Sequence, residues 1–251
     1  MIRAVVLCLM MALPVRAEQI VSGLSQSRVS IDARFDGTSI LIYGAAMREE
    51  KPPVWPLLQV IITVAGPEVP IVVRQKERVA GIWVNRGAVA VDGAPSFYSV
   101  MTTGPLEDIL SVAEDETYNV SIPREVGAAR LGSNAGSAAE YLAALQRIRA
   151  AQGVYTLEPD TVLLLQQSLF RTEVGLPSNL TEGDYKVRIF LTRGGAVVDL
   201  QESIISVRKA GLERLLFRMA QDQPLLYGVI SLLMAALAGW AASEAFRRLR
   251  L

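Results

Sequence analysis

The sequence predicts a mainly β protein with one transmembrane α-helix near its C-terminus. The stretch from Gln223 to Ser243 has no charged side chain, and at about 1.5 Å per residue its length matches a hydrocarbon core of roughly 30 Å. Most of the chain before it consists of short apolar or alternating runs bounded by Gly, Pro, Asn and Asp, which is typical of β-strands. Clear helical spacing outside the span occurs mainly around residues 138–152.

The first residues have the pattern of a signal peptide. Arg3 precedes an apolar run from Ala4 to Leu13, and Val15 and Ala17 are the small residues that a signal peptidase recognises. We therefore expect cleavage between Ala17 and Glu18. The alternative is an uncleaved anchor, which would give a chain with two spans, although the apolar run is short for a bilayer.

Composition excludes several kinds of chemistry. The chain has no histidine, and its single cysteine, Cys8, lies in the predicted signal peptide. Zinc sites built from Cys and His, His-ligated haem and Ser-His or Cys-His catalysis are therefore excluded from the mature protein. Between leader and span, acidic residues slightly outnumber basic ones, so there is no basic footprint for nucleic acid. We predict no enzymatic activity, no catalytic residue, no cofactor and no metal.

The first strands follow from alternation and turn residues. The pattern from Ser27 to Phe35 predicts a half-buried strand, and Asp36-Gly37 predicts a hairpin turn into a second strand with Ile40 and Ile42 facing inward. The nearly continuous apolar run from Leu57 to Pro67 predicts a strand in the middle of a sheet.

Charged residues mark the strand that follows Pro70. Arg74, Lys76 and Arg78 recur at alternate positions, a pattern that protects an edge strand from pairing with other chains. Together with Trp83, which follows them, these three residues are also our candidate contact for an anion or a partner loop. A solvated edge strand with no ligand is the alternative.

Shorter elements follow. Strands are predicted at 81–85, 88–91 and 96–103, and a short helix is predicted to start after Pro105. The acidic run at 114–116 predicts a solvated turn, because it lacks the spaced Asp, Asn and Gly residues of a calcium loop. A longer helix is predicted from Ala138 to Gln152.

The β pattern resumes after this helix, with strands predicted at 161–166 and 169–177. A long hairpin is then predicted, in which Gly194-Gly195 joins an alternating strand from residue 184 to a strand that ends near residue 207. The preceding run of Pro177, Leu180, Gly183 and Tyr185 resembles the closing strands of immunoglobulin-like sandwiches. We therefore expect an immunoglobulin-like β-sandwich with an inserted helix-containing lobe.

The predicted organisation is a signal peptide at 1–17, a periplasmic β-rich domain at 18–208 with the inserted lobe at 79–153, an amphipathic juxtamembrane helix at 209–222, a transmembrane helix at 223–245 and a cytoplasmic tail at 246–251. Two small domains divided near residue 104 or 154 are the alternative to one discontinuous body. The juxtamembrane helix either lies on the membrane surface or continues the span. Three arginines after the span, Arg247, Arg248 and Arg250, mark the cytoplasmic flank.

Small residues recur every four positions in the span, at Ser231, Ala235, Gly239 and Ser243. Such a stripe lets a second helix approach closely, although Ala and Gly are common in spans generally. We predict that this face packs against another integral membrane protein or against a second copy of the chain.

Four phrases resemble a known family: VVRQKERVAGIWVNR at 72–86, PSFYSV at 95–100, SLFRTEV at 168–174 and QPLLYG at 223–228. They resemble the alphaproteobacterial putative transmembrane protein family, whose members have a signal peptide, an outer domain and one C-terminal span. The resemblance implies a location in the bacterial inner membrane and an association with exporters of the sulfite or organosulfonate type; it brings no catalytic residues. We therefore predict a noncatalytic accessory module for another membrane protein, with periplasmic small-anion binding or sensing as the alternative.

Overall fold

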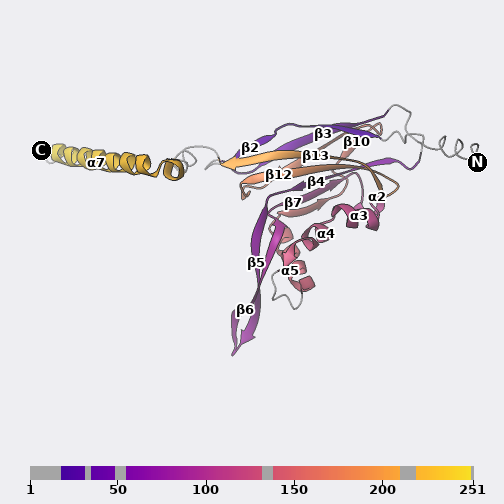
Figure 1. Cartoon of the computed structure of the whole chain (residues 1–251), viewed down its shortest axis with the longest axis horizontal. Helices are drawn as coiled ribbons and strands as arrows, with labels where there is room; N and C mark the ends of the chain where they lie inside the picture. The colour runs from indigo at the N-terminus through magenta and orange to yellow at the C-terminus, as the bar shows by residue number, and fades with distance from the viewer. Residues whose placement is uncertain (1–17, 32–34, 49–54, 132–137, 210–218, 250–251) are drawn as a thin grey trace, which may run out of the picture. The chain divides into compact units, whose positions relative to one another are not determined.

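The computed structural model describes residues 18–31, 35–48, 55–131, 138–209 and 219–249. In these ranges the chain is mainly β, with three sheets, short helices and one long apolar helix near the C-terminus (Figure 1). This confirms the predicted fold class at that level. Of the described residues, those within 18–29 and 35–207 belong to one compact unit, and residues 30–31 and the C-terminal segment that contains helix α7 belong to a second.

The largest sheet has six strands in the order β2-β13-β12-β4-β7-β9. These are β2 (Arg28–Ile31), β13 (Ala196–Lys209), β12 (Gly183–Arg193), β4 (Leu58–Ala65), β7 (Tyr98–Thr102) and β9 (Tyr155–Glu158). Strand β4 lies inside the sheet, as its apolar run predicted, and its residues from Val60 to Val64 are all buried. Both faces of this strand are therefore covered.

A four-stranded sheet covers the first face, in the order β1-β3-β11-β10. Its strands are β1 (Gln19–Leu24), β3 (Thr38–Met47), β11 (Leu169–Leu176) and β10 (Leu163–Leu165). Burial alternates strictly along β11, which is typical of a sheet with one packed face and one exposed face. The two sheets form a sandwich (Figure 1), and the Ile20 backbone N–H of β1 donates to Asp199 Oδ2 of β13 at 2.7 Å.

Glu18 also joins the two sheets. Its Oε1 lies 2.9 Å from Arg48 Nη1, just after β3, and 2.6 Å from Arg193 Nη2, at the end of β12. All three side chains are about seven-eighths buried, where an ion pair is screened far less than at a surface. The residue that we expect to follow signal cleavage is thus anchored between both sheets.

Three short helices cover the second face of the six-stranded sheet (Figure 1): α2 (Leu106–Ile109), α3 (Val112–Tyr118) and α4 (Ile122–Gly127). Phe190 of β12 is fully buried, and its ring lies 5.8 Å from that of Tyr118 of α3. The acidic run 114–116 lies in α3, so the predicted turn there is wrong. The Ser111 side chain caps this helix by accepting the Glu114 backbone N–H. Acidic residues in the first turn also stabilise the helix, because they lie near the positive end of its dipole.

Strands β5 (Glu68–Val79) and β6 (Ile82–Pro95) form a long hairpin, with β8 (Arg130–Leu131) as the third strand of its sheet. The predicted edge position of β5 is confirmed. The separate strands predicted at 81–85 and 88–91 are wrong, because both belong to β6. A bulge beside Gln75 shifts the register and lets one strand run through the glycine-containing segment.

The hairpin predicted at Asp36-Gly37 is also wrong. Strand β2 pairs in the six-stranded sheet, whereas β3 lies between β1 and β11 in the other sheet. A turn signal specifies a local bend and not the partner of the next strand. Strand β1, which the sequence did not predict, occupies the edge of β3 that β2 would have needed.

The second predicted hairpin is confirmed, since β12 and β13 pair around Gly194 and Gly195, whose φ angles are 60° and 84°. The Tyr185 hydroxyl donates to the Thr181 carbonyl at 3.0 Å. This bond from a buried tyrosine to backbone a few residues upstream is the one found in the tyrosine corner of immunoglobulin-like sandwiches. The immunoglobulin-like topology itself stays a prediction.

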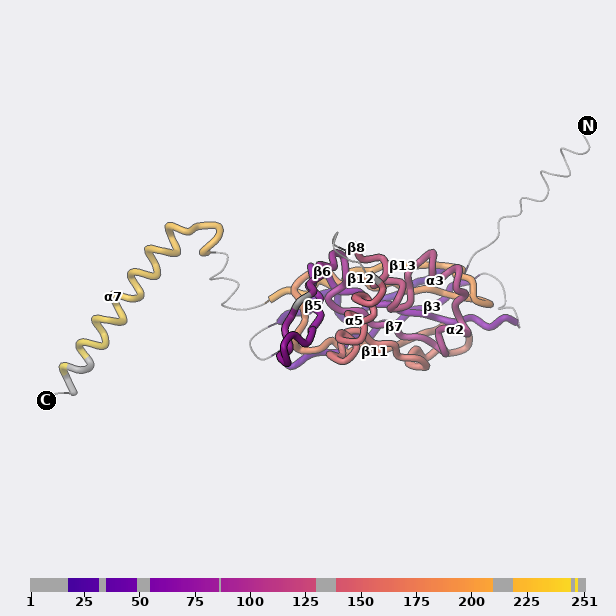
Figure 2. Tube along the Cα trace, turned by 90° about the horizontal axis from the view of Figure 1, so that it is seen from below, coloured from indigo at the N-terminus to yellow at the C-terminus, as the bar shows by residue number. Residues whose placement is uncertain are grey.

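The predicted helix at 138–152 is confirmed as α5 (Ala138–Ala151), which lies beside β5 (Figure 2). Within the segment predicted as an inserted lobe, β7 belongs to the six-stranded sheet. Helix α7 (Pro224–Leu249) contains the candidate span, Pro224–Glu244, with a mean hydropathy of 1.9. The predicted signal peptide, most of the juxtamembrane helix and the end of the tail lie outside the described residues.

Candidate functional site

A basic groove lies between β5 and α5. It has a volume of about 260 Å³, and its lining includes Arg74 and Lys76 from the strand and Arg147 from the helix. Glu140 of α5 contributes one acidic group to the same lining. Two of the three residues proposed as an anion contact thus share one groove with a third cation that the sequence did not single out.

The strand and the helix also meet through side chains at this groove. The Tyr141 hydroxyl of α5 donates to Gln75 Oε1 of β5 at 3.3 Å. Arg78, the third proposed contact, is exposed and pairs with Trp83 across the hairpin, and it does not line the groove. The geometry therefore divides the predicted set into a groove pair and a separate cation nearer the hairpin turn.

The small-residue stripe on α7 is exposed along its whole length. Ser231, Ala235, Gly239 and Ser243 are all exposed, as are the larger apolar residues of the helix between them. Within the described residues, no part of the candidate span is buried.

A second exposed apolar surface lies on the outer face of the four-stranded sheet. Strand register places Val21, Ala45, Leu169 and Leu165 in one row across all four strands. The three large residues of this row are each at least half exposed, and Tyr43 adds an exposed ring in the neighbouring row. We call this surface the outer row. The sequence missed it because its residues occupy positions that an alternating pattern reserves for polar side chains.

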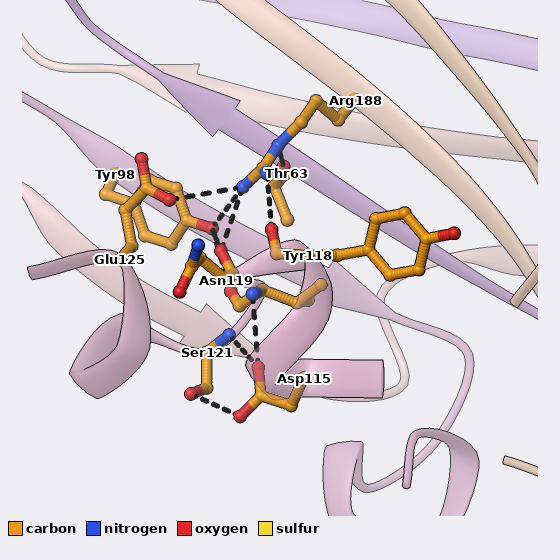
Figure 3. A network of polar contacts seen from close by, with 9 residues as sticks. Thr63, Tyr98, Asp115, Tyr118, Asn119, Ser121, Glu125 and Arg188 are labelled. Atoms are coloured by element: carbon orange, nitrogen blue, oxygen red, sulfur yellow. Dashed lines mark hydrogen bonds and ion pairs between the residues drawn. The ribbon is translucent and has the colours of Figure 1, made fainter. Parts of the chain in front are cut away.

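Arg188 of β12 is the centre of a largely buried polar network that joins the sheet to α3 and α4 (Figure 3). Its Nε donates to Thr63 Oγ1 of β4 at 3.2 Å, and its Nη1 donates to the Tyr118 carbonyl at 2.7 Å. Its Nη2 lies 3.0 Å from both the Tyr98 hydroxyl and the Asn119 carbonyl. Every nitrogen of the guanidinium therefore has a protein partner, which suits a structural role better than ligand binding.

The turn between α3 and α4 is shaped to supply these carbonyls. Asn119 ends α3 in the left-handed conformation, at φ 50°, which asparagine tolerates better than most residues. Asp115 Oδ1 accepts the Val120 and Ser121 backbone N–H groups at 3.1 and 2.7 Å, and its Oδ2 accepts the Ser121 hydroxyl at 2.7 Å (Figure 3). Asp115, which the sequence placed in a solvated turn, thus fixes the loop that Arg188 binds.

The network also contains an acid with a shifted pKa. Glu125 of α4 lies 3.4 Å from Arg188 Nη2, and about a quarter of its side chain is exposed. Burial raises the pKa of Glu125 above its ordinary value, and the attraction of Arg188 opposes this effect only in part. Burial likewise raises the pKa of Tyr98, whose hydroxyl donates to the Val120 carbonyl at 2.8 Å.

The acidic side chains of the described residues offer no metal centre. No group of three or more His, Cys, Asp or Glu side chains in this part of the chain lies close enough to hold an ion. In the Arg188 network, Glu125 contacts the guanidinium of Arg188, whereas Asp115 accepts the Ser121 backbone N–H. The two carboxylates therefore do not share a site.

Changing Glu125 to Gln should alter how stability depends on pH. Because the folded pKa of Glu125 is raised, its proton contributes stability that is fully present below the unfolded pKa and is lost as the pH rises through the folded pKa. Glutamine cannot ionise, so Glu125→Gln avoids that loss. The free energy of unfolding of the parent should therefore fall relative to that of the variant across this pH window. Chemical denaturation of the full chain in detergent at several pH values measures the difference.

Glu116→Gln is the matched control, because it removes an exposed carboxylate on the neighbouring helix that pairs with Arg124. The free energy of unfolding of the parent minus that of Glu125→Gln should fall as the pH rises. If this difference stays constant or rises with pH, the raised pKa of Glu125 is contradicted.

Comparison with known proteins places the chain in a family. Residues 19–248 match the family described as "Putative transmembrane protein (Alph_Pro_TM)", a range that runs from β1 almost to the end of α7. Nothing among the curated proteins matches the chain, and no solved structure does. Since the match covers the sandwich, the hairpin and the span together, the chain belongs to this alphaproteobacterial family of transmembrane proteins.

Proposed function

We propose that this protein is a noncatalytic, membrane-anchored interaction module for another inner-membrane protein, an exporter of the sulfite or organosulfonate type being the candidate that the family resemblance suggests. The observation that carries the proposal is the outer row on the four-stranded sheet. Monomeric soluble domains rarely expose contiguous apolar patches of large size, and such patches mark interaction sites. This row runs across all four hydrogen-bonded strands of the sheet, so the strand register places its side chains side by side.

Helix α7 supports the same proposal from within the bilayer. Its stripe of small residues allows close packing with a partner helix, where van der Waals contacts and Ser hydrogen bonds stabilise association. The arginines after the span favour a cytoplasmic C-terminus. On this topology the sandwich lies in the periplasm, and one partner with both a span and periplasmic loops contacts both surfaces.

Disrupting either surface should reduce co-purification of the partner. Leu169→Lys places a charge in the outer row, and Gly239→Ile places a branched side chain on the stripe. A charge buried against apolar surface and a bulky residue between closely packed helices both oppose association. Affinity purification of the full chain from detergent, followed by quantitative mass spectrometry, should show less of the same membrane protein with each variant.

Each variant has a matched control on its own element. Glu173→Lys adds a lysine to the same exposed face of β11 without removing an apolar residue. Leu237→Ile is exposed on α7 and lies on the opposite side of the helix from the stripe. Both controls should retain the partner. Recovery of this chain alone from the parent, or equal recovery from all four variants, would contradict the proposal.

Small-anion binding is a second candidate function, favoured by the basic groove. Arg74, Lys76 and Arg147 bring three cations to a cavity of about 260 Å³ that contains one carboxylate, Glu140. Guanidinium and ammonium groups bind oxyanions through charge-assisted hydrogen bonds. A periplasmic sensor for a small oxyanion would use this groove.

Sulfate or sulfite should then raise the melting temperature of the full chain, because a ligand that binds only the folded state stabilises it. Arg74→Ala and Lys76→Ala should abolish the shift, whereas Arg78→Ala, outside the groove, should preserve it. Differential scanning fluorimetry in detergent measures all three variants. A parent protein with no anion-dependent shift, or a shift that Arg78→Ala alone removes, would count against a sensor at this groove.

A further inference from the structure

The free end of the β5–β6 hairpin is apolar and exposed. Residues 79–84, which we call the hairpin tip, have the sequence VAGIWV and contain no polar side chain. Ile82 is 68% exposed and Trp83 is 66% exposed, and every residue from 74 to 85 is exposed. The hairpin projects away from the sandwich (Figure 1).

The backbone holds the tip in one conformation. Ala80 and Gly81 have φ angles of 50° and 84°, as in the two-residue turn whose twist matches paired strands. Val79 pairs directly with Ile82, and Arg78 pairs with Trp83. Paired residues of an antiparallel hairpin share a face, so the tip presents apolar side chains on both of its faces.

Basic residues lie immediately behind the tip. Arg78 is opposite Trp83 and Lys76 is opposite Asn85, and both cations are exposed. Glu77 lies between them in the sequence, so residues 76–78 contain two cations and one acid and stay net basic. An apolar end that contains Trp, followed by a net basic flank, is the composition of segments that insert at the interface of an anionic bilayer. We call Lys76 and Arg78 the basic flank.

We propose that the hairpin tip inserts into the lipid bilayer as a second membrane contact, in addition to the C-terminal span. The inference is independent of the proposed partner. A protein partner fits the tip less well, because a stable interface buries about 800 Å² on each side. Six residues, two of which are Ala and Gly, present much less surface than that. Shallow insertion needs only the side chains of the tip, about 5–10 Å deep.

The tether keeps the tip within reach of a bilayer. Positions 210–223, which are 14 residues, separate β13 from α7, and at about 3.5 Å per residue they span at most about 50 Å. The hairpin adds reach of its own, because the 12 residues of β5 extend about 40 Å at roughly 3.3 Å each. The tether therefore limits the distance between the sandwich and the bilayer that holds α7, and the length of the hairpin adds to the reach of the tip.

Fluorescence of single tryptophans in the full chain tests the proposal. The chain has three tryptophans, so Trp55→Phe with Trp240→Phe leaves Trp83 as the reporter. The protein is reconstituted into vesicles of phosphatidylethanolamine and phosphatidylglycerol, with and without brominated phosphatidylcholine. We expect brominated lipid to quench Trp83 and aqueous acrylamide to quench it weakly.

Trp55 provides the matched control, since it is 78% exposed and lies outside the hairpin. With Trp83→Phe and Trp240→Phe, the remaining Trp55 should be quenched by acrylamide and not by brominated lipid. Adding Ile82→Asp to the Trp83 reporter should remove the lipid quenching. Lys76→Gln or Arg78→Gln should lower the ratio of inserted to free tip by roughly fivefold per charge.

Acrylamide quenching of Trp83 equal to that of Trp55, with no effect of brominated lipid, would overturn the proposal. It would also be overturned if Trp83 is shielded from acrylamide in native membranes but remains unquenched by brominated lipid in vesicles. That second result would identify a protein as the occupant of the tip.

Discussion

The contacts of Arg188 decide whether the central sheet can have two covered faces. Strand β4 is buried on both sides, and its second face carries Thr63, a polar residue with no exposed surface. Short helices such as α3 and α4 are not stable on their own, so they need a specific attachment. Arg188 provides it by binding the carbonyls of Tyr118 and Asn119 while it contacts Thr63 and the Tyr98 hydroxyl. A buried guanidinium without these partners would be strongly destabilising, so the helices and the arginine stabilise each other.

The sequence was sufficient where burial pattern alone determines an element. The central position of β4, the edge position of β5, the β12–β13 hairpin and the span were all predicted, because each has a local signal: an apolar run, alternating charges, paired glycines or a long uncharged stretch. Strand pairing was not predictable at Asp36-Gly37, since the turn residues carry no information about β1, which occupies the same edge of β3.

The basic groove was predicted only in part. Arg74 and Lys76 lie together on one strand, but Arg147 joins them only through the packing of α5 beside β5. The Arg188 network could not be predicted, because two of its partners are backbone carbonyls of a turn and its side-chain partners come from strands and a helix far away in the sequence.

The polar and apolar residues of the protein thus have different tasks. The buried charges, Glu18 with its two arginines and Arg188 with Glu125, are used to hold sheets and helices together. Many of the large apolar residues that remain exposed lie on the outer row, the hairpin tip and α7, three surfaces suited to protein or lipid, although others, such as Trp55 and Val112, are exposed singly elsewhere. This division is what an anchored interaction module requires. In the proposed function the sandwich presents one surface, the outer row, and in the proposed insertion the hairpin tip contacts the bilayer in addition to the span.

The side of the membrane on which the sandwich lies is the most direct test of this account. In a Cys8→Ser background the chain has no other cysteine, so a single engineered thiol reports its own location. Glu182→Cys, exposed just before β12, should react with a membrane-impermeant maleimide in spheroplasts. Leu251→Cys, at the other end of the span, should react only after the inner membrane is lysed. Labelling of Leu251→Cys in intact spheroplasts with protection of Glu182→Cys would contradict a periplasmic module.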